Sequence, residues 1–101
     1  MCDQEELYDQ RAELLKALSH PVRLRIVRGL LRCGCHNVTC MERAIGQSQS
    51  CISQHLNKLK SAGIVKAVRV GNEMRYEIAS PQVAGLVAVL FGDKMEDYVN
   101  V

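Results

Sequence analysis

The sequence predicts one mainly α-helical domain with a small β-hairpin, in the order helix–helix–helix–helix–strand–strand–helix. Apolar residues recur at helical spacing in successive stretches up to Gly63. Two short strand-like segments then flank a Gly-Asn pair, and a last apolar stretch follows a Ser-Pro pair. With 101 residues, 48% of them apolar, the chain can bury one core without disulfides or a metal.

The first two helices are predicted over residues 5–18 and about 21–32. One helical face of the first carries four leucines: Leu7, Leu14, Leu15 and Leu18. Pro21 suits the first turn of the second helix, because its fixed φ is helical and its missing N–H has no helical partner there. The apolar stripe of this helix comprises Leu24, Val27, Leu30 and Leu31.

The next two helices predict a helix-turn-helix. After a break at residues 33–37, Thr39 or Asn37 caps a short helix that ends near Ile45, and Gly46 stops it. A longer helix follows at roughly 49–62, with Ser48 as N-cap and Gly63 as the left-handed residue after its end. Its apolar positions repeat at i, i+4 and i+7: Ile52, Leu56 and Leu59.

A hairpin wing and a final helix complete the domain, which spans residues 1–101. The strands are predicted over 64–70 and 74–78, around the turn Gly71-Asn72. The last helix, about 81–91, is apolar on nearly every side, so something must cover it. We expect a second copy of the same helix, joined by the helix at 5–18, and therefore a homodimeric winged helix-turn-helix.

Basic residues are concentrated in the middle of the chain. Residues 20–75 hold ten Lys and Arg against two Glu, a net charge of +8, whereas residues 1–19 and 76–101 each carry −3. A basic centre between acidic ends favours binding of a polyanion, and nucleic acid is the first candidate.

The helix at 49–62 carries an uncharged polar face opposite its apolar one. Serine, glutamine and asparagine side chains both donate and accept hydrogen bonds, as base edges in the major groove require. An ordinary solvated face would carry Glu and Lys. Basic residues beside this face and on the wing would contact phosphates, which fix register and not sequence. The predicted DNA contacts are Gln49, Ser50, Ser53, Gln54, Asn57, Lys58, Lys60, Arg69, Asn72 and Arg75.

Three cysteines lie within eight residues at the start of the helix-turn-helix: Cys33, Cys35 and Cys40. Cys-X-Cys is too tight for a structural zinc knuckle. Three thiolates suit a soft ion such as As(III), Pb(II) or Cd(II), and His36 or Cys2 are possible further ligands.

A redox switch is the alternative function of the same thiols. In it a Cys33–Cys35 or Cys35–Cys40 disulfide forms in response to an oxidant, persulfide or electrophile, and no metal is needed. Cys51 belongs to the redox set as well, because its modification would disturb the DNA-facing helix directly. His55, one turn from Cys51, is expected to have a structural or DNA-proximal role and not to bind a metal.

The strings LKALSHPVRLRIVRGLL and QSQSCISQHLNKLKSAGIVKAVRVGNEMRYEI resemble the ArsR/SmtB family of bacterial winged-helix repressors, over about residues 15–78. The resemblance implies a homodimer that sits on an operator and leaves it when a metal, metalloid or thiol-reactive signal binds. By position it also implies base contacts from Gln49, Ser50, Ser53 and Gln54. The wing contacts it implies are Arg69, Asn72 and Arg75.

The chain departs from the family's known sensor motifs. The Cys-Val-Cys that arsenic and cadmium sensors carry on the third helix would fall at Asn37 and Thr39, so here the Cys-X-Cys precedes that helix. Residues 81–91 contain no His, Asp, Glu or Cys, which argues against the metal site that the zinc and nickel sensors carry there. The same segment also lacks the cysteine that pairs with an earlier one in the sulfide-responsive branch. The effector is therefore not assigned by motif.

Other classes of function are not supported by the sequence. No His-Asp orienting pair, Gly-rich phosphate loop or HExxH motif indicates an enzyme. No run of about 18 apolar residues predicts a membrane span, and the acidic start lacks a signal-peptide pattern. We therefore expect a cytoplasmic protein with reduced thiols.

Overall fold

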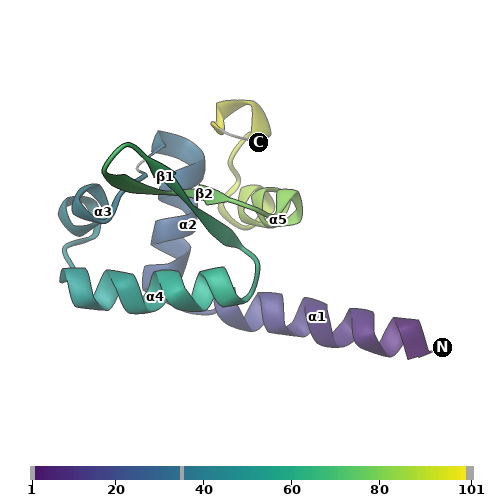
Figure 1. Cartoon of the computed structure of the whole chain (residues 1–101). Helices are drawn as coiled ribbons and strands as arrows, with labels where there is room; N and C mark the ends of the chain where they lie inside the picture. Colours follow the sequence, from purple (N-terminus) through teal and green to yellow (C-terminus); the bar gives the residue numbers. More distant parts are fainter. Residues whose placement is uncertain (1, 35, 100–101) are drawn as a thin grey trace.

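The structure is a computed structural model that describes residues 2–34 and 36–99, with side chains from residue 4 onward in these ranges. The elements there are α1 (Cys2–Leu18), α2 (Pro21–Cys33), α3 (Val38–Ile45), α4 (Gln49–Ser61), β1 (Val65–Val70), β2 (Glu73–Ile78), α5 (Pro81–Phe91) and the 3₁₀ turn η1 (Met95–Asp97). The predicted order of helices and strands is confirmed (Figure 1).

Side-chain caps begin three of the helices. His20 caps α2: its Nδ1 accepts from the N–H of Val22 at 3.1 Å, and Pro21 is the first residue of the helix. Asn37, and not Thr39, caps α3 through a 2.7 Å bond from the N–H of Cys40 to its Oδ1. Ser48 caps α4, as predicted. These caps satisfy backbone N–H groups that have no partner within their helices.

The core lies where α2, α4, α5 and Val65, the first residue of β1, meet. Gly46, at φ +77°, turns the chain between α3 and α4, which pack on each other, and Met41 of α3 is buried in the core. The buried apolar residues are Leu14, Leu18, Ile26, Val27, Leu30, Leu31, Met41, Ile52, Leu56, Leu59, Ile64, Val65, Val83, Ala84, Val87, Ala88 and Tyr98.

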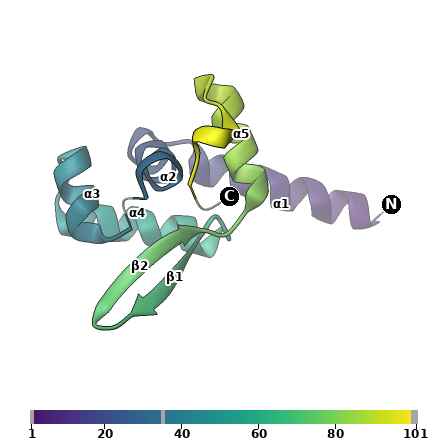
Figure 2. The same cartoon turned by 90° about the horizontal axis from the view of Figure 1, so that it is seen from above.

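The wing is an antiparallel pair in which Val70 faces Glu73 and Val65 faces Ile78. Two residues, Gly71 and Asn72, make the turn, and Gly71 has a φ of +64° that a Cβ would disfavour. Figure 2 shows the hairpin projecting away from the helices.

Helix α1 differs from its prediction in length and in packing. It begins at Cys2, and acidic residues in its first turns suit the positive end of the helix dipole. Leu14 and Leu18 are buried, but Leu7 and Leu15 are 45% and 55% exposed. The N-terminal part of α1 projects beyond the rest of the chain (Figure 1). In the described ranges no helix combines the length and the apolar character that crossing a membrane requires.

The sequence did not predict the ordered segment that follows α5. Asp93 accepts two hydrogen bonds from Arg28, at 2.8 Å each, and a third from the Tyr98 hydroxyl at 2.7 Å. The guanidinium of Arg28 also lies 4.4 Å from the centre of the Phe91 ring, and the N–H of Val99 donates to the carbonyl of Leu31. We call these five residues, Arg28, Phe91, Asp93, Tyr98 and Val99, the C-terminal clasp. It fastens the end of α5 to α2, so Arg28 is not a free cation of the basic centre.

Candidate nucleic-acid interface

Helix α4 presents its polar face to solvent because its opposite face is buried. Ile52, Leu56 and Leu59 are at most 1% exposed and fix the rotation of the helix. Of the predicted base-contacting side chains, Ser53 is half-buried and the others are exposed: Gln49, Ser50, Gln54 and Asn57. The structure thus brings the predicted polar set together on one accessible helix face.

The wing places two exposed side chains near its tip, Arg69 and Asn72. Arg75, which faces Val68 across the hairpin, is held in place by Glu73, whose Oε2 accepts from the Arg75 Nε at 3.1 Å. Hydrogen bonds from Asn37 and then from Arg75 lower the pKa of Glu73. A carboxylate therefore sits beside one of the predicted phosphate-binding cations and sets its position.

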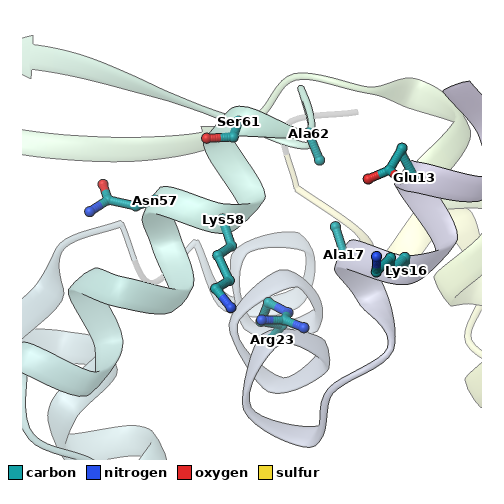
Figure 3. Close-up of a pocket in the computed structure, with 8 residues that line it drawn as sticks. All are labelled: Glu13, Lys16, Ala17, Arg23, Asn57, Lys58, Ser61 and Ala62. Atoms are coloured by element: carbon teal, nitrogen blue, oxygen red, sulfur yellow. The ribbon is translucent and has the colours of Figure 1, made fainter.

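The two predicted lysines of α4 lie in different surroundings. Lys60 is exposed on the last turn. Lys58 extends toward Arg23 of α2, at the edge of a pocket between α1, α2 and α4 (Figure 3).

The structural role expected for His55 is consistent with its contacts. Its ring lies 4.4 Å from that of His20, and its Nδ1 lies 3.5 Å from Nη1 of Arg23. Burial, followed by the charges of His20, Arg23 and Lys58, lowers the pKa of His55. The neutral imidazole thus joins the start of α2 to the inner side of α4, while Cys51 nearby is a half-buried free thiol.

The predicted thiol cluster is only partly within the described residues. Cys33 ends α2 as an exposed free thiol, and Cys40 lies in the first turn of α3 and is disulfide-bonded. Cys35 and the side chain of Cys2 lie outside the described residues, and His36 is half-buried. Among described side chains no three His, Cys, Asp or Glu are grouped as a metal site requires, so the three-thiolate site stays a prediction.

The segment that carries the thiols is hydrogen-bonded to the wing, a connection the sequence did not predict. The N–H of Tyr76 in β2 donates to the carbonyl of His36 at 2.8 Å. Asn37, the cap of α3, donates from Nδ2 to Oε1 of Glu73. The only sequence signal was Glu73 itself, one of two acidic residues in the basic centre.

Comparison with known proteins gives one consistent family. Residues 20–67 match the family described as "Bacterial regulatory protein, arsR family". The transcriptional repressor PagR of Bacillus anthracis is 40% identical over 79 residues, 78% of this chain and 79% of PagR. A probable mercury resistance operon repressor of Streptomyces lividans is 39% identical over 78% of this chain and 62% of its own length.

Solved structures agree with these sequence matches. The crystal structure of PagR superposes with a TM-score of 0.77 at 37% identity, over 85% of this chain and 98% of that one. A homodimeric winged helix-turn-helix DNA-binding domain of Mycobacterium bovis also gives 0.77 at 37% identity, over 88% and 82% of the two chains.

Proposed function

Because the chain belongs to the arsR family of bacterial regulatory proteins, which are transcriptional repressors and not enzymes, we propose that it is a homodimer that binds a specific operator and leaves it when its cysteines change state. The observation that carries the DNA-binding part is the exposed, uncharged polar face of α4 beside the wing. In the proposed complex α4 enters the major groove, and Arg69, Asn72 and Arg75 follow the adjoining backbone.

The proposed dimer joins α1 and α5 of two chains. An apolar pocket of about 300 Å³ runs between these helices, lined by Leu15, Leu18, Leu24, Leu86 and Leu90, among others. On the same helix, Val89 and Leu90 are 85% and 65% exposed. Adjoining exposed apolar side chains of this size indicate a surface that another molecule covers. A two-fold partner covers both features and presents two copies of α4 to duplex DNA.

Replacing Val89 by lysine is expected to convert the dimer to monomer, because the ammonium would be buried against a second α5. Sedimentation velocity at micromolar concentration measures the change. Met95→Lys is the matched control, since Met95 is also exposed but lies in η1. If Val89→Lys sediments as the wild type does, the dimer uses another surface.

For the effector we propose thiol oxidation, because Cys40 is disulfide-bonded and lies at the start of the helix-turn-helix. Two thiols release two electrons and two protons as the disulfide forms, and one hydrogen peroxide takes them up to give two waters. The sequence offers two pairings, Cys33–Cys35 and Cys35–Cys40, and we propose the second because Cys33 is a free thiol.

The hydrogen bonds between residues 36–37 and β2 supply a path from the thiols to DNA. A disulfide at Cys40 constrains the residues whose carbonyl and side chain hold Tyr76 and Glu73. Glu73 in turn positions Arg75. Changing the thiol state would therefore move a wing cation relative to α4, and a coupling of about 1–3 kcal/mol corresponds to a 5–150-fold change in affinity.

A thiophilic metalloid or metal is the second candidate effector, bound by reduced Cys33, Cys35 and Cys40 with His36 or Cys2 as further ligands. Soft sulfur donors suit As(III), Cd(II) or Pb(II). The mercury resistance repressor among the relatives favours keeping this candidate.

One set of variants distinguishes the two effectors. We expect peroxide to weaken operator binding of the reduced protein at least tenfold, and Cys40→Ser to abolish the response. Cys33→Ser is the control, because Cys33 is a free thiol. If peroxide has no effect but arsenite gives one thiolate charge-transfer band per chain and releases the DNA, the metalloid is the effector. If neither acts, the cysteine switch is wrong, although the repressor function stands.

A further inference from the structure

A pocket of about 470 Å³ opens between the end of α1, the start of α2 and the end of α4 (Figure 3). Three cationic side chains line it, one from each helix: Lys16, Arg23 and Lys58. Glu13 is the one carboxylate among its lining residues, so the formal charge of the pocket is +2. We call it the three-helix pocket.

The cations of this pocket are not neutralised by the protein. Within the described ranges, no ion pair involves Lys16, Arg23 or Lys58. The buried Nε of Arg23 has no hydrogen-bond partner, and its Nη1 has only a 3.5 Å contact with His55. Figure 3 shows Lys58 extending toward Arg23. Like charges gathered in this way repel one another, and a bound anion would offset that repulsion.

The polar side chains and the helix ends favour an oxyanion. Asn57 and Ser61 of α4 line the pocket and supply neutral donors. Arg23 is the third residue of α2, whose first turn contains no acidic side chain, so the positive end of that helix adds to the field. Guanidinium, ammonium and amide donors around one opening are the groups that bind phosphate oxygens.

The position of the pocket favours a phosphate of the DNA backbone. Asn57 belongs both to the pocket and to the polar face of α4, so the two surfaces are continuous. The pocket also lies at the end of α4 that meets α1, one of the proposed dimer helices. We therefore expect the backbone of a duplex that contacts α4 to pass this end of the helix.

We infer that the three-helix pocket seats a backbone phosphate of the operator, with Lys16 and Arg23 as contacts beside Lys58. This inference rests on the proposed DNA-binding function and adds to it a contact outside the helix-turn-helix and the wing. Neutralising a phosphate releases condensed counterions, so each lost contact lowers the slope of log K against log salt concentration by about 0.9.

The test measures operator affinity as a function of KCl concentration for the full chain, with an operator selected from a random duplex library. Arg23→Gln and Lys16→Gln are each expected to lower the slope by about 0.9. Lys94→Gln, an exposed charge change on the segment after α5, is the control and should leave the slope unchanged. Glu13→Gln should tighten binding, because it removes the one negative charge from the pocket.

The outcomes separate this inference from the function on which it rests. If the wild type selects no operator, the proposed function fails. If the wild type binds but Arg23→Gln and Lys16→Gln keep its slope, the three-helix pocket does not bind a phosphate of the DNA. Lys16 is exposed, so its variant is informative even if Arg23→Gln does not fold. Calorimetry with inorganic phosphate covers the other source: binding that Arg23→Gln abolishes, with an unchanged DNA slope, assigns the pocket to a free phosphate compound.

Discussion

Truncation of Tyr98 to alanine is expected to lower the free energy of unfolding by about 3 kcal/mol, the usual cost of removing a buried aromatic side chain. Tyr98 is 7% exposed and belongs to the C-terminal clasp. For a domain of this size the loss corresponds to a fall of roughly 12–24 °C in Tm. Urea denaturation followed by circular dichroism, at one fixed protein concentration because the proposed dimer links stability to concentration, measures it.

Two variants separate the parts of this effect. Tyr98→Phe keeps the ring and loses only the hydroxyl that donates to Asp93, so it should destabilise far less than Tyr98→Ala. Met95→Ala changes an exposed side chain of the same segment and should lie within about 0.5 kcal/mol of the wild type. Equal losses for Tyr98→Ala and Met95→Ala would mean that the segment does not pack on α2.

The clasp also gives stability a defined dependence on pH. Hydrogen bonds from Arg28 and then Tyr98 hold the pKa of Asp93 well below its ordinary 3.8, so its contribution is present above pH 3.8 and is lost as pH falls. Burial, with the bond to Asp93, raises the pKa of Tyr98 from 10.0 to about 12. Its contribution is therefore present below pH 10 and is lost between pH 10 and 12. In Tyr98→Phe this alkaline component should disappear.

Replacement of Gln54 by alanine is expected to weaken operator binding by about 1–3 kcal/mol, or roughly 5–150-fold, if its amide contacts a base edge in the major groove. Gln54 is exposed on α4, and no hydrogen bond within the described part of the chain engages its side chain, so stability should not change. Fluorescence anisotropy with operator and with an unrelated duplex of equal length measures the loss of specificity.

Lys60→Gln is the matched comparison on the same helix. It should weaken binding to both duplexes alike and lower the salt slope by about 0.9, because an ammonium contacts a phosphate and not a base. Gln54→Ala should leave the slope at the wild-type value. A Gln54 variant that weakened both duplexes equally would show that this side chain does not select sequence.

Features that depend on one element could be predicted from the sequence. The exposed face of α4 follows from the spacing of Ile52, Leu56 and Leu59, because burial of one helical stripe fixes where every other side chain of that helix points. The hairpin register follows in the same way from the two-residue turn at Gly71 and Asn72.

Features that depend on several elements could not be predicted. Asp93 counted only as part of an acidic end, because nothing in residues 92–99 shows a period, and its partner Arg28 lies 65 positions away. The three-helix pocket takes one cation from each of three helices, so no single helix displays it. The sequence favoured Thr39 over Asn37 as the cap of α3, and only the geometry at the start of α3 identifies Asn37.

The separation of Arg28 and Asp93 along the chain has a kinetic consequence. A contact between residues 65 positions apart closes a long loop, whereas the turns within α2, α3 and α4 close short ones, so the helical centre should be ordered before the clasp forms. Interactions that form after the rate-limiting step of folding act mainly on the rate of unfolding. The clasp thus governs the lifetime of the folded chain more than the speed at which it is reached.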